Sequence, residues 1–204
     1  MRTFNKTHKD DGFIKVVNVN IPFPIKKYEI IYADPPWSYN DKMSNHSFSL
    51  DHEYETQDIN WIKNLPVKDI TEKNCCLFIW VVSPMLKEGI EVLESWGFKF
   101  KTIAFCWSKY SESGKEIHNL GRWTMGNIEL CLLGVKGKPN SWRQCNNIKQ
   151  LIKAKRTKHS AKPLEIRKRI VDLLGVNRSR IELFSRSRSN GWDSWGNEEE
   201  QFNN

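Results

Sequence analysis

The sequence lacks a long hydrophobic run and a cysteine pattern typical of metal sites. No segment approaches the roughly 18 consecutive apolar residues of a membrane span, and the opening residues MRTFNKTHKDDGF contain no apolar core of a signal peptide. The five cysteines include no C-x-x-C pair and no matching histidine spacing, so we expect reduced core thiols and no metal ligands. These absences favour a cytoplasmic protein that does not enter a membrane.

The chain also lacks internal repeats and low-complexity linkers that would divide it. Its 204 residues, 39% of them hydrophobic, are enough for one domain with a sizeable core. We therefore expect a single domain over residues 1–204, with mobile tails at about 1–12 and 198–204.

Positive charge is concentrated in the last third of the chain. Between Lys149 and Arg188 there are thirteen Lys and Arg and three acidic residues, a balance of +10 against +8 for the whole chain. A solvated surface is one explanation, but the concentration favours a footprint for a polyanion. The residues that we expect to contact nucleic acid are Lys153, Lys155, Arg156 and Lys158.

Short apolar runs predict an α/β fold. They are continuous rather than alternating, which is typical of strands covered on both faces. One helix is expected between Ser83, as its N-cap, and Gly97, and it would join two strands into a β-α-β unit. A second helix is expected over about Pro163–Leu174, with Gly175 as its stop. The predicted strands are Glu29–Ala33, Cys76–Val82, Thr102–Trp107, Leu130–Val135 and Arg180–Phe184.

The stretch IIYADPPW places Asp34 directly after the first predicted strand. Ligands of open α/β sheets bind beyond the carboxyl ends of the strands, so Asp34 is expected at a site. The two prolines restrict the backbone, leave the carbonyls of Asp34 and Pro35 free, and are followed by the flat face of Trp37. A simple strand-ending turn with a core tryptophan explains the same residues.

An acceptor cluster of this kind suits a nucleobase amino group. The lone pair of such a nitrogen is delocalised into the ring, so acceptors that hold its N–H groups favour a nucleophilic geometry and stabilise the positive charge that develops. Two long polar stretches, Ser38–Asp58 and Ser108–Asn127, are typical of binding loops or lids.

The sequence resembles the MT-A70 family of N6-adenine methyltransferases along nearly its whole length. The motifs that carry the resemblance occur in the family's order. They are YADPPW at 32–37, Y-x-T at 54–56, FIWVVSPMLKEGIEVLESWGFKFKTIAFCW at 78–107, NIELCLLGVKG at 127–137, HSAKP at 159–163 and RIELFSR with GWDSWGNE at 180–198.

The resemblance implies a Rossmann-like fold that binds S-adenosylmethionine, in permuted order, with the DPPW motif first and the cofactor motif C-terminal. It implies that Asp34, Pro35, Pro36 and Trp37 are catalytic, with Asp34 and Pro35 holding the adenine amino group and Trp37 shaping the base pocket. The substrate residues would be Tyr39 and Tyr54, and the cofactor residues Asp34, Lys162, Glu182, Arg186 and Asn197. Glu182 lies in an apolar run and therefore needs hydrogen-bond donors, which ribose hydroxyls or a structural arginine would both supply.

The chain departs from relatives at one motif. Many carry W-T-R-S-N-P-E where this sequence has WTMGNIE at 123–129, so Met125 replaces a basic residue and target preference is open. There is no F-x-G-x-G loop, which fits the family, and we expect no separate target-recognition domain.

The resemblance implies DNA as the substrate, because the chain is similar to the small bacterial and phage members of the family. RNA N6-adenosine methylation and a non-catalytic nucleic-acid-binding partner subunit are the alternatives, and N4-cytosine methylation is a minor one. The intact Asp34 motif argues against the non-catalytic partner. The sequence leaves open whether the chain forms homo- or hetero-oligomers.

Overall fold

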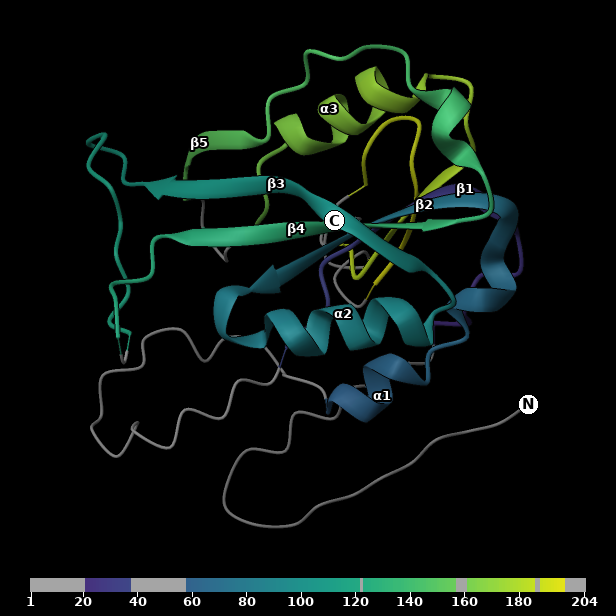
Figure 1. The fold of residues 1–204 in the computed structure, drawn as a ribbon, viewed down its shortest axis with the longest axis horizontal. Helices are drawn as coiled ribbons and strands as arrows, with labels where there is room; N and C mark the ends of the chain where they lie inside the picture. The colour runs from purple at the N-terminus through teal and green to yellow at the C-terminus, as the bar shows by residue number, and fades with distance from the viewer. Residues whose placement is uncertain (1–20, 38–57, 122, 157–160, 186–187, 197–204) are drawn as a thin grey trace, which may run out of the picture.

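A mixed seven-stranded sheet organises the part of the chain that the structure describes (Figure 1). The structure is a computed structural model and describes residues 21–37, 58–121, 123–156, 161–185 and 188–196. The strand order is β5-β3-β4-β2-β1-β6-β7. The strands are β1 (Tyr28–Ala33), β2 (Thr71–Val82), β3 (Lys99–Tyr110), β4 (Ile128–Lys136), β5 (Leu151–Lys155), β6 (Arg180–Leu183) and β7 (Asp193–Trp195).

One strand, β4, runs against the other six. It pairs antiparallel with both β2 and β3, whereas β1 pairs parallel with β2 and β6, β3 with β5, and β6 with β7. The carboxyl ends of six strands therefore lie at one edge of the sheet, and the beginning of β4 joins them there. This edge is on the left of Figure 1, where β3 and β2 end.

Helices cover both faces of the sheet (Figure 1). Along β1, Ile31 and Ala33 lie in a core cluster with residues of α1 and α2, whereas Ile30 and Tyr32 lie in a second cluster with residues of α3. The helices are α1 (Ile59–Lys63), α2 (Leu86–Ser95) and α3 (Glu165–Leu174), with 3-10 turns η1 (Val67–Ile70), η2 (Ser83–Met85) and η3 (Pro139–Trp142). None of these helices is long and apolar enough to cross a membrane.

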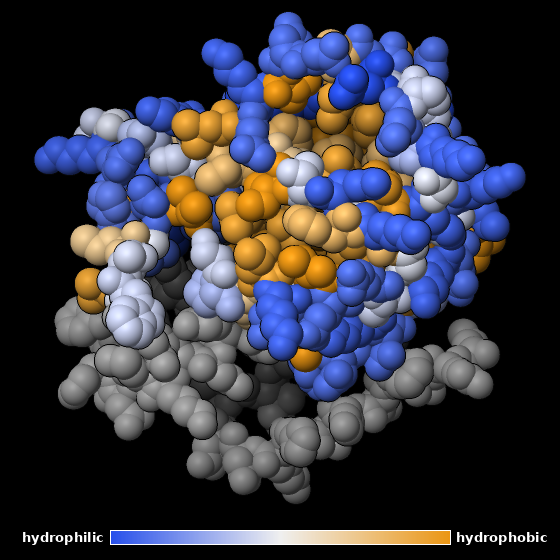
Figure 2. Space-filling model, in the orientation of Figure 1, coloured by the Kyte–Doolittle hydropathy of each residue, from blue (hydrophilic) through white to orange (hydrophobic). Residues whose placement is uncertain are grey.

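Apolar side chains also reach the surface on the face that carries α2. Figure 2 shows them gathered in the middle of this face, with hydrophilic side chains around them. Ile90 of α2 and Ile103 and Cys106 of β3 are only partly buried where they pack against the first cluster. The five cysteines are free thiols, and burial raises the pKa of the Cys76 thiol to about 12.

The five predicted strands and both predicted helices are confirmed, with differences at their ends. Ser83 does not cap α2, because residues 83–85 form a 3-10 turn and the N-cap is Met85. Gly175 does end α3, with a φ of 98° that favours glycine. The predicted β-α-β unit exists as β2-α2-β3, but β4 lies between its two strands.

Three short elements escaped the sequence analysis. The edge strand β5 alternates exposed and buried residues and contains two lysines, β7 has three residues, and α1 has five. Elements this short carry too little periodicity to be recognised. The tails predicted at 1–12 and 198–204 lie outside the described residues.

Candidate active site

Asp34 lies at the carboxyl edge of the sheet, as predicted. It follows the last residue of β1, whose neighbours on either side are β2 and β6. Its backbone N–H donates to the carbonyl of Leu183 at the end of β6, at 3.4 Å. The side chain is only 15% exposed, so the carboxylate is held at the edge rather than projecting into water.

Two hydrogen bonds donated by Trp37 hold the turn after Asp34. The backbone N–H of Trp37 donates to the carbonyl of Pro35 at 2.9 Å, and the indole Nε1 of Trp37 donates to the carbonyl of Trp80 at 2.8 Å. The expectation that the Pro35 carbonyl is free was therefore wrong, although a carbonyl oxygen has a second lone pair. The indole bond ties the turn to β2 and fixes the orientation of the tryptophan ring.

Lys162 is the partner of Asp34. Its Nζ lies 2.8 Å from the Asp34 carboxylate and 3.1 Å from Oε2 of Glu129, the second residue of β4. It also lies 5.6 Å from the centre of the Trp80 ring, a favourable position for a cation. One ammonium group therefore bridges two carboxylates, one directly after β1 and the other in β4.

A second lysine completes the cluster. Lys109, next to last in β3, donates from Nζ to Oε1 of Glu129. All four side chains are largely buried, with exposed fractions between 10% and 15%. We call Asp34, Lys162, Glu129 and Lys109 the charge chain, because its negative and positive members alternate and cancel.

Glu129 and Lys162 stay ionised because their oppositely charged neighbours outweigh the effect of burial. Burial acts to raise the pKa of Glu129, but the charges of Lys162 and Lys109 outweigh it and the pKa is lowered. Burial likewise acts to lower the pKa of Lys162, yet Asp34 and Glu129 raise it. A buried charge without such partners would be neutralised or costly.

Glu182 has the structural partner that the sequence left open. Arg167 of α3 donates to both carboxylate oxygens, from Nε at 2.6 Å and from an η nitrogen at 2.7 Å. This bidentate pair joins α3 to β6. A cofactor role for Glu182 stays a prediction. In that role, its carboxylate would bind the cofactor while it also accepts hydrogen bonds from Arg167.

The segment after β6 has a strained turn at the same edge. Phe184 has a φ of 62°, a left-handed backbone that is uncommon for a bulky residue. Its ring packs edge-on against Trp195 at 5.6 Å, and the N–H of Ser185 donates to the carbonyl of Trp195 at 3.1 Å. Strain of this kind often marks functional edges.

The predicted site residues divide into a described and an undescribed set. Asp34, Pro35, Pro36, Trp37, Lys162 and Glu182 share the carboxyl edge of the sheet. Of the expected nucleic-acid contacts, Lys153, Lys155 and Arg156 lie on or directly after β5. Five predicted residues lie outside the described part of the chain: Tyr39, Tyr54, Lys158, Arg186 and Asn197.

Sequence reasoning missed Glu129 and Lys109. A carboxylate that opens the apolar run IELCLLGV was a usable signal, since a charge in such a run needs a partner. The partner could not be named, because Lys109 and Lys162 are separated from Glu129 by 20 and 33 residues, and only the tertiary structure brings them together.

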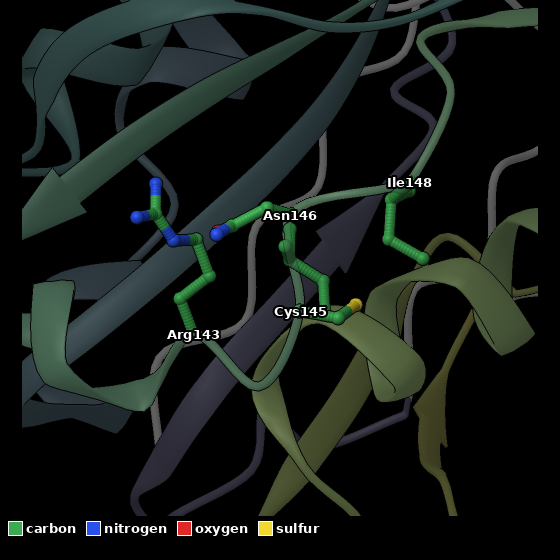
Figure 3. A pocket seen from close by; sticks show the side chains of 5 residues that line it. Arg143, Cys145, Asn146 and Ile148 are labelled. Carbon is green, nitrogen blue, oxygen red and sulfur yellow. The ribbon is translucent and has the colours of Figure 1, made fainter.

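A separate cavity of about 230 Å³ does not belong to this cluster. Figure 3 shows Arg143, Cys145, Asn146 and Ile148 on the segment between η3 and β5. Its remaining lining residue, Leu173, is in the last turn of α3, about 12 Å along the helix from Glu165 at 1.5 Å per residue. Lys162 lies just before the opposite end of that helix.

Comparison with known proteins identifies the family. The MT-A70 family model matches residues 28–198, which includes every described residue of the charge chain. The chain belongs to the MT-A70 family. It is therefore a methyltransferase of the MT-A70 type.

The chain spans most of one similar protein and less than a third of another. It is 35% identical over 210 residues to the Type II methyltransferase M.MunI of Mycoplasma sp, covering 95% of this chain and 87% of that protein. It is 29% identical over 192 residues to the human N(6)-adenosine-methyltransferase catalytic subunit METTL3, covering 91% of this chain and 30% of that protein.

Proposed function

We propose that this protein transfers a methyl group from S-adenosylmethionine to the N6 amino group of adenine in DNA. The observation that carries the proposal is the buried Asp34 carboxylate, fixed by Lys162 at 2.8 Å beside the Pro35-Pro36-Trp37 turn. The location at the carboxyl edge of an α/β sheet is where such folds bind their ligands.

Asp34 can accept a hydrogen bond from an adenine amino group while it remains paired with Lys162. A carboxylate has about four lone-pair sites, so Lys162 and an amino N–H can be bound together. The amino nitrogen becomes positive as it attacks, and a fixed negative charge beside it stabilises that transition state more than the ground state. Glu129 supports this role, because it shares the Lys162 charge that would otherwise neutralise Asp34.

The residues present fit the charged end of the cofactor. S-adenosylmethionine carries an ammonium group, a carboxylate and the sulfonium-bound methyl group that it donates when bound. Asp34 and Lys162 offer one anion and one cation at the same edge, and Lys162 has three N–H donors to share. With the cofactor bound here by C-terminal residues that include Glu182, Arg186 and Asn197, the motif order would be permuted.

The similarity to M.MunI favours DNA over RNA. That Type II methyltransferase is matched over 87% of its length, whereas this chain spans about a third of METTL3. RNA N6-adenosine methylation is the second candidate, because METTL3 is named an N(6)-adenosine-methyltransferase and adenosine is the ribonucleoside. The complete charge chain at Asp34 argues against a non-catalytic partner subunit, which would not need it.

A direct product analysis tests the proposal. Purified protein is incubated with S-adenosylmethionine carrying a deuterated methyl group and with duplex DNA, single-stranded DNA or RNA. The nucleic acid is then digested to nucleosides and analysed by mass spectrometry. Labelled N6-methyldeoxyadenosine is the expected product, and Asp34→Asn is the matched control. A label on cytosine, on RNA alone, or on no nucleoside would reject the proposal as stated.

A further inference from the structure

The connection between β3 and β4 carries three apolar side chains that belong to neither of the core clusters formed by the described residues. Leu120, Trp123 and Met125 have exposed fractions of 94%, 97% and 60%. We call these three residues the apolar tip. A tryptophan left almost wholly in water loses the free energy that its burial would provide, so this ring suggests a partner outside the chain.

The apolar tip is held by a structured stem. Asn119 and Gly126 exchange two backbone hydrogen bonds, at 2.7 and 2.9 Å, and thereby close the loop that carries the tip. Within the loop, a Cβ on Gly121 would lie 2.2 Å from the carbonyl oxygen of Thr124, so the tight turn requires glycine. The tip is therefore presented by a constrained loop, which limits the entropy lost when it binds.

The stem is attached to the sheet at two residues of the charge chain. It begins after Lys109 and ends before Glu129, the two residues that pair across its base. The N–H of Lys109 also donates to the carbonyl of Asn127, at 3.3 Å. Figure 1 shows this connection extending beyond the edge at which β2 and β3 end, which is the edge that carries Asp34.

Positive charge lies beside the stem. β5 pairs with the end of β3, with Lys155 opposite Tyr110, and the N–H of Arg156 donates to the Tyr110 carbonyl at 2.8 Å. Lys155 reaches across to Glu112 in the stem, at 2.9 Å. A polyanion that follows β5 would therefore pass the stem with its phosphates on the lysines.

We propose that Trp123 stacks on a nucleobase of the substrate, next to the adenine that enters the site. The inference rests on the proposed function. A polynucleotide complements this surface, because its bases are flat faces that can stack on the ring and its phosphates carry the negative charge that the lysines attract. Three side chains are also far fewer than the 20 to 30 residues that a stable protein interface engages on each side. In a duplex, the ring reaches a base face only where a pair has opened, as it must when adenine leaves the stack.

The test compares Trp123→Ala with Trp123→Phe, which keeps an aromatic face. Binding to a labelled oligonucleotide that the wild type methylates is measured over a salt series. Loss of one stacked base should weaken binding by roughly 5- to 150-fold for Trp123→Ala and by less than about threefold for Trp123→Phe. The salt slope should not change, because the contact releases no counterion. Ile25→Ala, at a side chain 96% exposed, is the control for loss of an exposed apolar group and should bind as the wild type does.

An abasic scan locates the stacked base. Abasic sites are placed one at a time along the oligonucleotide, and each is measured with the wild type and with Trp123→Ala. At one position beside the target adenine, removing the base should weaken the wild type but leave Trp123→Ala unchanged. Equal losses at every position, or unaltered affinity of Trp123→Ala, would overturn the inference.

Two outcomes separate this inference from its alternatives. A wild type that methylates no nucleic acid would remove the proposed function itself, before any variant is compared. A wild-type dimer that becomes monomeric in Trp123→Ala, measured by light scattering, would show that the tip binds a second copy of the chain and would overturn the stacking.

Discussion

Glu129→Gln should destabilise the protein far more than a surface substitution. Glu129 is 11% exposed and contacts Lys162 and Lys109, which are 12% and 10% exposed. The amide keeps the shape of the side chain but leaves two buried ammonium groups with Asp34 as their one remaining carboxylate in the charge chain. Breaking a buried pair by removing one partner costs about 3–5 kcal/mol, which is a large part of the 5–15 kcal/mol stability of a typical domain.

A double-mutant cycle with Lys109→Met isolates the charge effect. Each single variant unbalances the charge chain, whereas Glu129→Gln with Lys109→Met restores its neutrality. The double variant should therefore lose less free energy of unfolding than the sum of the singles, by about 0.5–3 kcal/mol. Urea unfolding at pH 7 measures all four proteins. Losses that add to within about 0.5 kcal/mol would refute the idea that these charges are coupled.

The destabilisation caused by Glu129→Gln should depend on pH. Burial acts to raise the pKa of Glu129, but Lys162 and Lys109 lower it below the ordinary 4.5. The carboxylate therefore stabilises the fold above pH 4.5, and this contribution is lost as the pH falls through the lower folded value. The stability difference between wild type and Glu129→Gln should shrink below pH 4.5. Lys162, whose pKa is raised above 10.5, loses its contribution only as the pH rises through that higher value.

Three further predictions concern activity and binding. Asp34→Ala should reduce methyl transfer by orders of magnitude while circular dichroism shows a retained fold, and near-normal turnover with a confirmed product would exclude its proposed role. Lys162→Ala and Asn197→Ala should both weaken binding of S-adenosylhomocysteine in calorimetry. Asn197→Ala should raise KM more than it lowers kcat, whereas Lys162→Ala should also lower kcat because Lys162 holds Asp34; unchanged affinity in both would reject their cofactor assignment. Reversing Lys153, Lys155, Arg156 and Lys158 to Glu should weaken binding to all DNA sequences about equally and lower the slope of log K against log salt by roughly 0.9 per lost phosphate contact. A reversed protein with the parent's affinity and slope would show that β5 is only a solvated edge.

Local sequence was enough to predict much of the framework. The continuous apolar run before Asp34 predicted a strand buried on both faces, and β1 does place alternate residues in the two core clusters. Gly97 and Gly175 predicted two helix ends because positive φ is cheap only for glycine, and their φ values are 86° and 98°. The location of Asp34 followed from the same logic, since the residue after a parallel strand lies at the ligand edge.

The charge chain was decided by the tertiary structure. Asp34, Lys109, Glu129 and Lys162 come from four separate segments, and their spacing in the sequence predicts no contact. They meet because β4 enters the sheet antiparallel between β2 and β3, which places its second residue at the edge where β3 and β1 end. The sequence by itself determined that Glu129 would need a partner, because it opens an apolar run and an unpaired charge is costly in an apolar environment. Only the tertiary structure determined which partner each one has, because ion pairing depends on distance in space and is indifferent to separation along the chain.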